Sequence, residues 1–325
     1  MRFSNLLVTG GSGFIGTNFI KYILKNTNCS VVNYDKLTYA ANKNSHNMFS
    51  DDKRYSFVLG DINDTPLLDK TVKESKIDAI INFAAETHVS NSIVSPERFV
   101  KTNVNGTLSI LSVVRKNNLK LHHISTDEVF GPTENETRIF NEESPYHPTS
   151  PYSASKAAAD HLVESFIKTY GIDATISFSS NNFGPYQHSE KLIPKTISRV
   201  MNNKKPIVFG DGTHKRNWLY VLDYCRAIKL ILEYGKKGEK YCISGKNEMT
   251  NLSLVKKILR IIGKNEDFFE FSDLRPTDDK RYLIDDSKIK TQFGFKTIID
   301  FDSALEDTVK WYLENEKWLR ELRSF

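Results

Sequence analysis

Two short segments carry side chains suited to acid–base chemistry on an alcohol. Tyr152 and Lys156 lie four residues apart, so a helix would place both side chains on one face. A tyrosine has a pKa of about 10, and a neighbouring ammonium ion favours the phenolate, which could accept a hydroxyl proton. The other segment places Thr126 beside two adjacent carboxylates, Asp127 and Glu128. Oxidation of an alcohol requires only the tyrosine and the lysine, whereas elimination of water also requires an acid and a base.

The two carboxylates have alternative interpretations. If they are buried together, Asp127 and Glu128 repel each other and their pKa values separate, which leaves one protonated acid and one ionised base. They could instead cap a helix or face solvent, and the spacing of Tyr152 and Lys156 is also common on ordinary surface helices. Thr126 ends an expected strand, where its hydroxyl could orient the reacting oxygen. The surrounding elements therefore have to decide between these interpretations.

A glycine-rich turn near the N-terminus supplies part of that context. Gly11, Gly13 and Gly16 fit the pattern G-x-G-x-x-G, directly after an apolar run at 6–9 and before a helical pattern at 14–24. Glycines at such a turn let the backbone approach a pyrophosphate, and the helix N-terminus adds N–H donors and a positive dipole. We therefore predict a dinucleotide-binding loop.

Acidic residues after the next two strands favour NAD as the dinucleotide. Asp35 lies 19 residues after Gly16, where a carboxylate would accept hydrogen bonds from ribose hydroxyls and repel a 2′-phosphate. This favours NAD over NADP, although the neighbouring Lys36 weakens the argument. Asp61 and Ile62 follow the third strand and are expected at the adenine edge, or in a simple surface turn. With NAD bound, the tyrosine would take a hydroxyl proton while hydride leaves the same carbon.

The first half of the chain alternates strand and helix patterns. Its longest helical stretches are 97–117 and 152–170. Strands that alternate with helices are typical of a parallel sheet covered on both faces. We predict an α/β fold with a Rossmann-type doubly wound parallel sheet, which binds its ligand at the carboxyl ends of the strands. The expected strands are 6–9, 31–35, 55–59, 79–83, 121–125 and 174–178.

The pattern changes after about residue 180. We predict an NAD-binding Rossmann domain at 1–180 and a smaller C-terminal α/β substrate domain at 181–325, with a cleft between them. A later segment near 215–235 is expected to return to the first domain. Further elements expected in the second half are a helix at 192–201, a strand at 207–209 and a helical stretch at 301–322 that carries Trp311 and Trp318.

The composition indicates an ordinary soluble protein. Of the 325 residues, 39% are hydrophobic and 26% are charged, which fits a chain with a sizeable core. No apolar run reaches the roughly 18 residues needed to span a bilayer, and the N-terminus lacks the pattern of a signal peptide, so we expect a cytoplasmic protein without membrane contact. The net charge of +5 is spread along the chain, which argues against dedicated nucleic-acid binding. Cys29, Cys225 and Cys242 have neither disulfide nor metal spacing and are expected to be buried or half-buried thiols, without a metal site.

Together these motifs resemble the extended short-chain dehydrogenase/reductase family and, within it, the nucleotide-sugar 4,6-dehydratases. The resemblance covers nearly the whole chain. The Thr-Asp-Glu triplet at 126–128 separates dehydratases from related epimerases, whereas the glycine motif and the Tyr-Lys pair identify only the superfamily. The matching segments are TGGSGFIG (9–16), YDKLTYA (34–40), GDI (60–62), FAAETHV (83–89), TNVNGT (102–107), HISTDEVFG (123–131), SPYSASKA (150–157), NNFGPYQ (181–187), EKLIP (190–194), GDGTHKRNWLYV (210–221) and RPTDDKRY (275–282).

The resemblance implies a reaction that couples oxidation to loss of water. Tyr152 would deprotonate the glucose 4-hydroxyl, with Thr126 orienting that oxygen and Lys156 supporting the phenolate, while hydride passes from C4 to NAD. Glu128 would then remove the C5 hydrogen, and Asp127 would protonate the departing 6-hydroxyl. Return of the hydride to C6 gives a nucleotide 4-keto-6-deoxyglucose and water, with no net consumption of NAD. The product would lead towards rhamnose or other deoxysugars.

The resemblance also implies two sets of ligand contacts. Arg216 and Arg281 suit the clamping of a diphosphate, although they could also be surface ion-pair partners. The expected cofactor contacts are Gly10, Gly13, Phe14, Ile15, Gly16, Asp35, Lys36, Thr38, Asp61, Ile62, Phe83, Ala84, Ala85, Thr102, Tyr152, Lys156 and Asn182. The expected substrate contacts are Thr87, Thr126, Asn181, Lys191, Leu192, Arg216, Asn251 and Arg281.

A few residues depart from the usual pattern of the dTDP-sugar enzymes. Where those enzymes usually carry Asp-Arg, this chain has Ser90 and Asn91, and Asn217 replaces a common Asp. The differences concern the nucleobase more than the type of reaction. Asn91 and the segment 278–286 look closer to the UDP-sugar enzymes of rhamnose synthesis, so the sequence slightly favours UDP-glucose over dTDP-glucose.

Two other functions stay open at this point. A nucleotide-sugar 4-epimerase or decarboxylase of the same superfamily needs the Tyr-Lys pair but no pair of acid–base carboxylates. A non-enzymatic dinucleotide sensor would tolerate the loss of Tyr152 and Lys156, although both residues are present.

The resemblance further implies a homodimer. In this family, two helices from each subunit form a four-helix interface, and here they would be 97–117 and 152–170. The alternative is that both helices pack only on their own sheet. Their apolar positions include Leu108, Leu111, Val114, Leu162 and Phe166.

Overall fold

The computed structural model describes residues 2–45, 47–133, 139–273 and 279–321. Its largest element is a seven-stranded sheet with the order β10-β6-β5-β4-β1-β2-β3, in which all neighbouring strands are parallel. The order changes direction between β1 and β4, which creates a switch point at their carboxyl ends. The predicted doubly wound parallel sheet is therefore confirmed. Its strands are β1 (Asn5–Thr9), β2 (Ser30–Asp35), β3 (Tyr55–Leu59), β4 (Ala79–Asn82), β5 (Lys120–Thr126), β6 (Asp173–Ser179) and β10 (Lys240–Ile243).

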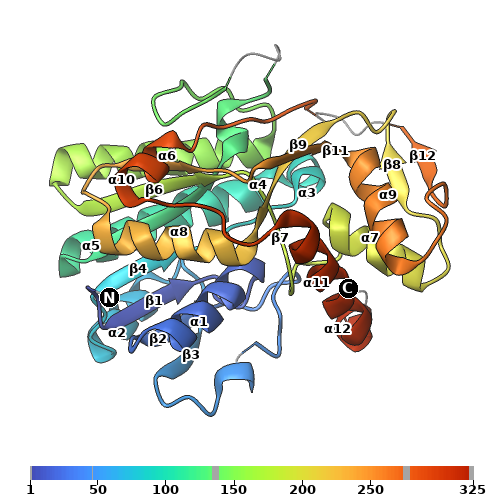
Figure 1. The fold of residues 1–325 in the computed structure, drawn as a ribbon. Coiled ribbons are helices and arrows are strands. Elements are labelled where there is room, and N and C mark those ends of the chain that lie inside the picture. The colour runs from blue at the N-terminus through green and yellow to red at the C-terminus, as the bar shows by residue number, and fades with distance from the viewer. Residues whose placement is uncertain (1, 46, 134–138, 274–278, 322–325) are drawn as a thin grey trace.

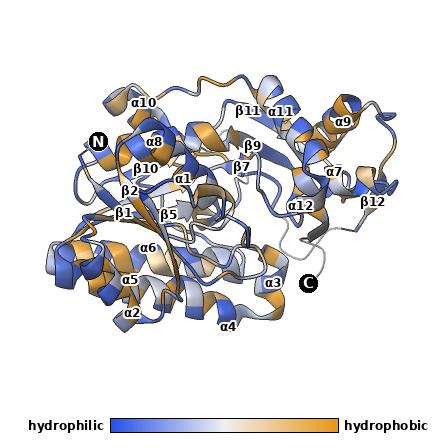
Figure 2. Ribbon diagram, turned by 90° about the horizontal axis from the view of Figure 1, so that it is seen from below, coloured by the Kyte–Doolittle hydropathy of each residue, from blue (hydrophilic) through white to orange (hydrophobic). Residues whose placement is uncertain are grey.

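Helices cover both faces of this sheet (Figures 1 and 2). Side chains alternate along a strand, and both sides of β1 are buried: Leu6 and Val8 belong to the core on one face, and Leu7 to the core on the other. Because neither face meets water, the strands read as continuous apolar runs. One face is covered by α1 (Phe14–Asn26), α8 (Val221–Tyr234) and α10 (Ser287–Phe293), and the other by α2 (Thr65–Glu74), α5 (Gly106–Asn117) and α6 (Pro151–Tyr170).

The C-terminal part builds a second group of elements beside the carboxyl edge of the large sheet (Figure 1). Phe183 and Trp218 share an apolar core with the helices α7, α9 and α11. The division at residue 180 stays a prediction, but the chain does return to the large sheet through α8 and β10, slightly beyond the expected 215–235. The second group contains a sheet of order β11-β9-β7, namely β7 (Asn181–Phe183), β9 (Lys215–Tyr220) and β11 (Asn247–Thr250), the strand pair β8 (Ile207–Phe209) and β12 (Glu270–Ser272), and the helices α7 (Leu192–Met201), α9 (Asn251–Ile262), α11 (Phe301–Glu314) and α12 (Glu316–Glu321).

Two predicted helices are interrupted. The stretch 97–117 consists of α4 (Pro96–Phe99), a π-helical turn η2 (Val100–Asn105) and α5. The wide turn points Asn103 inward, where its amide bonds both backbone groups of Glu86 and the Ser155 hydroxyl at 2.8–3.1 Å. The stretch 301–322 breaks at Asn315, whose side-chain amide donates to the carbonyl of Trp311 at 2.8 Å. Leu322, the last residue of that prediction, lies outside the described residues.

Short elements complete the fold. The helix α3 (Val89–Val94) and the 3₁₀ turns η1 (Asn47–Phe49) and η3 (Asp127–Phe130) have no counterpart in the predictions. Cys29, Cys225 and Cys242 are buried, as expected. Within the described ranges, no helix is long and apolar enough to cross a membrane, and no group of three or more His, Cys, Asp or Glu side chains could hold a metal ion.

Candidate active site

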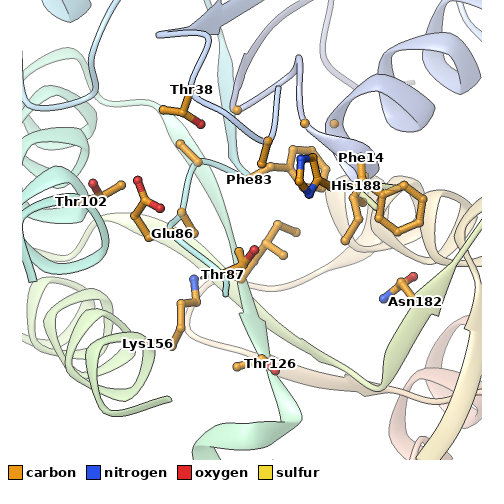
Figure 3. A pocket seen from close by; sticks show the side chains of 18 of the residues that line it. Phe14, Thr38, Phe83, Glu86, Thr87, Thr102, Thr126, Lys156, Asn182 and His188 are labelled. Carbon is orange, nitrogen blue, oxygen red and sulfur yellow. Dashed lines mark hydrogen bonds between the residues drawn. The ribbon is translucent and has the colours of Figure 1, made fainter. Parts of the chain in front are cut away.

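A pocket opens at the carboxyl ends of β1, β4 and β5, next to the switch point of the sheet. Its walls come from the glycine loop, the ends of these strands, the first turn of α6 and the segment after β7. Figure 3 shows Lys156 and Thr126 reaching this space from α6 and β5, with Phe14 and His188 on another side. The two segments with acid–base side chains therefore meet the dinucleotide loop in one cavity.

The glycine loop has the geometry of a pyrophosphate site. Gly10 has a φ of +68°, and a Cβ there would lie 2.6 Å from the backbone nitrogen of Ala84. A Cβ at Gly16 would collide with the carbonyl of Gly10, so the loop and the helix can approach this closely only with glycine. Gly13 directly precedes α1 and lines the pocket. The loop thus presents a bare backbone and a helix N-terminus to a ligand.

Asp35 occupies the end of β2 as predicted. Its carboxylate accepts hydrogen bonds from the backbone N–H groups of Ser12 (3.0 Å) and Leu37 (2.7 Å). Burial raises its pKa, and these two hydrogen bonds act in the opposite direction. Lys36 Nζ lies 3.4 Å from Asp61 Oδ2. The cation beside Asp35 therefore has a carboxylate partner, and the residues fit the ribose of NAD.

Almost all predicted cofactor contacts face this pocket. Asp61 is the exception, because its side chain bonds Asn63 and Lys36 instead of lining the cavity. Burial opposes ionisation of Asp61, but the hydrogen bonds from Asn63 and the charge of Lys36 outweigh it and lower its pKa. The lining residues among the predicted contacts are Gly10, Gly13, Phe14, Ile15, Gly16, Asp35, Lys36, Thr38, Ile62, Phe83, Ala84, Ala85, Thr102, Tyr152, Lys156 and Asn182.

The reacting centre is positioned by the start of α6 and the end of β5. Ser150 caps α6 through a reciprocal pair of hydrogen bonds with Ser153, which fixes the turn that carries Tyr152. One turn later, Lys156 Nζ donates to the carbonyl of Ile124 at 2.6 Å. The hydroxyl of Thr126 acts on Tyr152 in the direction that lowers its pKa, and the same oxygen accepts a hydrogen bond from the Glu128 backbone N–H at 3.3 Å. Tyr152, Lys156 and Thr126, which were predicted to act together, thus lie together at the pocket.

Electrostatics at this centre depend strongly on burial. Burial, followed by the charge of Glu128, raises the pKa of Tyr152 well above its usual range. Burial lowers the pKa of Lys156 to about 8, against the opposing charge of Asp160. Without a ligand, the protein therefore favours the neutral phenol, and the expected phenolate depends on the positive charge of a bound nicotinamide.

Asp127 has the properties of a proton donor. Its side chain is 5% exposed, and burial, followed by the charge of the adjacent Glu128, raises its pKa to about 8, while Arg216 acts in the opposite direction. Asp127 is therefore mostly protonated at neutral pH. Both carboxylates line the pocket, and neither is an ordinary surface group.

The predicted substrate contacts divide into two groups. Thr87, Thr126, Asn181 and Lys191 line the pocket, and Lys191 Nζ donates to the Thr87 carbonyl at 3.0 Å. The remaining four, namely Leu192, Arg216, Asn251 and Arg281, lie outside its lining.

The outer group contains the two proposed diphosphate clamps. Arg281 forms a two-pronged ion pair with Glu248, at 2.5 and 3.1 Å. Arg216 donates to the carbonyl of Asp279 at 2.8 Å and lies over the ring of Tyr282 at 4.9 Å. Both guanidinium groups are thus held by protein partners, and their role with a diphosphate stays a prediction. The Asn251 side-chain oxygen is buried and has no hydrogen-bond partner among the described residues.

The titratable residues of the pocket that sequence reasoning missed include Glu86, His188 and Glu190. Glu190 Oε2 lies 3.5 Å from His188 Nδ1 and 4.0 Å from His88 Nε2. Burial opposes ionisation of Glu190, but the hydrogen bond with His188 and the charge of Lys191 lower its pKa. The sequence did offer one indication of these residues. Glu86 lies inside the matching segment 83–89, Glu190 lies inside the segment 190–194, and His188 lies just before that segment.

The fold and the site define a class, the NAD-dependent enzymes of the short-chain dehydrogenase/reductase type that act on nucleotide sugars. The comparisons narrow this class. The chain belongs to the nucleotide-sugar 4,6-dehydratase family, because the family model described as GDP-mannose 4,6 dehydratase matches residues 7–308. The prediction of an NAD-dependent nucleotide-sugar dehydratase is therefore confirmed, and so is the prediction of NAD as its cofactor.

Individual relatives cover nearly the whole chain. A dTDP-glucose 4,6-dehydratase of Mycolicibacterium smegmatis is 45% identical over 98% of this chain and 96% of its own length. The structure of a dTDP-glucose 4,6-dehydratase from Bacillus anthracis in complex with NAD has a TM-score of 0.92 at 40% identity, covering 98% of this chain and 99% of that one. A UDP-glucose 4-epimerase from Thermotoga maritima is more distant, with a TM-score of 0.88 at 26% identity over 96% of this chain and 99% of its own.

Proposed function

We propose that the chain converts dTDP-glucose to the 4-keto-6-deoxyglucose nucleotide and water. The observation that carries this proposal is the pair of adjacent carboxylates, the buried Asp127 and the half-buried Glu128, which lines the same pocket as Tyr152. The pair supplies a protonated acid next to a second carboxylate, which an epimerase does not need. NAD bound at the glycine loop would accept a hydride from the sugar and later return it.

The chain's own groups divide the proton transfers. Tyr152, oriented by Thr126, takes the proton of the 4-hydroxyl. The resulting 4-ketone makes the hydrogen at C5 acidic, and Glu128 removes it. Asp127 gives its proton to the 6-hydroxyl, so that the C6–O bond breaks and water leaves. Each group thereby serves one step, and proton transfers of this kind each contribute about 100-fold to 10,000-fold in rate.

The nucleobase is inferred from the relatives. Those from Mycolicibacterium smegmatis, Haemophilus influenzae and Escherichia coli, which are 42–45% identical, are all dTDP-glucose 4,6-dehydratases. They outweigh the slight preference for UDP-glucose that Asn91 and the segment 278–286 suggest. Asn91 lies on α3, and Asp278 of that segment lies outside the described residues. UDP-glucose therefore remains the alternative substrate.

A side-by-side assay tests the substrate. The protein is supplied with NAD and either dTDP-glucose or UDP-glucose, and the products are analysed by mass spectrometry. We expect loss of one water from both, with the higher kcat/KM for dTDP-glucose. A higher kcat/KM for UDP-glucose would overturn the nucleobase, and isomeric products of unchanged mass would overturn the dehydratase in favour of an epimerase.

We also propose a homodimer through the α4–η2–α5 and α6 face and a cytoplasmic location, with a product that feeds rhamnose or other deoxysugar synthesis. Leu111 and Val114 are fully buried in the core of their own sheet, so two of the five predicted interface positions point inward. Leu162 and Phe166 are partly buried. Leu108 (42% exposed) and Val100 (49% exposed) do face outward. These exposed apolar side chains support a partner helix pair.

A further inference from the structure

A chain of buried polar side chains runs behind the reacting centre, from α6 to the glycine-loop strand. Asp160 on α6 is completely buried and accepts a hydrogen bond from the Ser125 hydroxyl at 2.6 Å. Its other oxygen lies 3.4 Å from His123 Nε2. His123 Nδ1 contacts the Asn82 amide at 3.2 Å, and the Thr9 hydroxyl donates to the same amide at 2.7 Å. None of these five residues belongs to the predicted site.

The hydrogen bonds determine the tautomer of His123. Because the oxygen of Asn82 accepts from Thr9, its NH₂ group faces His123 and must donate to Nδ1. Nδ1 is therefore an acceptor, and the proton of a neutral imidazole sits on Nε2, facing Asp160. Burial, followed by the charge of Lys156, lowers the pKa of His123, which agrees with a neutral ring. The proton on Nε2 thus lies toward Asp160 Oδ1 at 3.4 Å, although neither of these two buried atoms has a hydrogen-bond partner among the described residues.

Lys156 is the cation nearest to this carboxylate on α6. Asp160 follows Lys156 by four residues, so both side chains lie on one face, with Cβ atoms about 5–6 Å apart. Lys156 is itself buried, and it donates a hydrogen bond to a neutral carbonyl, that of Ile124. A buried ammonium without a nearby opposite charge would lose its proton. The negative charge that acts on Lys156 is that of Asp160, one helical turn away.

We propose that Asp160 is a positioning residue, which keeps Lys156 in its ammonium form and is itself held by the hydroxyl of Ser125. His123, Asn82 and Thr9 continue the row of buried polar side chains from Asp160 to the strand that carries the glycine loop. The use of Lys156 in catalysis rests on the proposed function, but its protonation is a property of the protein alone. The two can therefore fail separately.

Several titratable groups face this pair and bear on the test. His123 approaches from β5 and Tyr146 from the segment before α6, while Tyr152 lies on α6 itself, and the charge of Asp160 raises the pKa of both tyrosines. Asp127 and Glu128 act on Tyr152 from η3. For Lys156, the influences are burial, which lowers its pKa to about 8, and Asp160, which opposes this.

The test is a titration of Lys156 by NMR. The protein is labelled with ¹³Cε-lysine, and the Lys156 signal is assigned from its loss in Lys156→Arg. In Asp160→Asn we expect the midpoint to fall by about one pH unit or more. Turnover lost at neutral pH should then recover as the pH is lowered by the same amount, because the ammonium forms again. A merely structural role would lower turnover equally at all pH values.

Glu164→Gln is the matched control. It removes a carboxylate one turn further along α6, where Glu164 pairs with Lys240 at 3.1 Å, and it should leave the Lys156 midpoint and turnover unchanged. An unshifted midpoint in Asp160→Asn, or equal shifts in both variants, would overturn the proposal. If Asp160→Asn does not fold, the titration midpoint of Lys156 in the wild-type protein tests the proposal instead. Buried lysines without a partner titrate near pH 5–6, so we expect a wild-type midpoint above about 7, and one below about 7 would overturn the proposal.

Discussion

At the scale of single residues, two neighbouring carboxylates are given different tasks by their surroundings. Asp127 is buried and has its pKa raised to about 8, partly by the charge of Glu128. A protonated acid thereby stands beside a carboxylate, in the arrangement by which two acidic groups can serve as acid and base at one pH. This division is what separates loss of water from simple oxidation of the sugar.

The raised pKa of Asp127 predicts the pH dependence of turnover. The acid works only in its protonated form, which is the main form below pH 8 and is lost as the pH rises through about 8. The ammonium of Lys156, with a pKa of about 8, is lost in the same direction. We therefore expect kcat to fall above pH 8, as measured with dTDP-glucose in buffers of constant ionic strength. A kcat that stays constant well above this pH would contradict the assignment.

Removal of the base should separate oxidation from elimination. In Glu128→Gln we expect NAD binding to be unchanged, because Glu128 is not among the cofactor contacts. Exchange of the C5 hydrogen with deuterated solvent should be blocked, and water loss should fall by about 100-fold or more. NMR of the recovered sugar measures the exchange. Exchange at the wild-type rate would refute Glu128 as the base.

Residue types were predictable at the reacting centre, but their electrostatics were not. The spacing of Tyr152 and Lys156 and the Thr-Asp-Glu triplet predict which side chains meet. The sequence does not show that Lys156 bonds the Ile124 carbonyl, or that Asp160 approaches His123. Such contacts join elements far apart in the chain, and a pKa depends on burial, which only the tertiary structure defines.

At the scale of elements, the glycine loop shows why its residues cannot be exchanged. Gly10→Ala meets two costs: a left-handed φ of +68° and a contact with Ala84 at 2.6 Å. The first costs about 1–2 kcal/mol and the second about 1–3 kcal/mol. We expect a clear loss of unfolding free energy in urea and weaker binding of NAD by titration.

Gly263→Ala is the matched control for this prediction. Gly263 ends α9 with a φ of +78°, and a Cβ there meets no atom within 4 Å. It should therefore lose only the conformational cost of about 1–2 kcal/mol and keep its affinity for NAD. Equal effects of the two substitutions on NAD binding would show that the close approach to Ala84 is unimportant.

The elements also show which patterns a sequence reveals. The strands of the large sheet are buried on both faces, so runs such as 6–8 and 79–81 are apolar throughout and easily found. The π-helical turn at 100–105 was missed, because six residues are too few to distinguish its period from that of an α-helix. The strand β11 was missed as well, since Asn247–Thr250 is half-buried along its length and has no apolar alternation.

At the scale of the whole molecule, the exposed apolar face of α5 leads to a prediction about assembly. Leu108→Glu places a charge on the proposed interface, where burial without a partner is unfavourable. We expect the sedimentation coefficient to fall from that of a dimer to that of a monomer at micromolar concentration. Leu313→Glu on α11 is the control, because Leu313 has the same exposure of 42% but lies away from that face. A wild-type monomer, or dissociation by both substitutions, would contradict the interface.

The central claim is that this cavity removes water from a nucleotide sugar, and one measurement tests it most directly. The protein is incubated with NAD and dTDP-glucose in D₂O, and the mass of the product is determined. We expect a product that has lost one water and carries one deuterium at C5, because Glu128 exchanges that hydrogen with solvent while Asp127 releases the 6-hydroxyl. A product of unchanged mass, isomeric with the substrate, would contradict the claim.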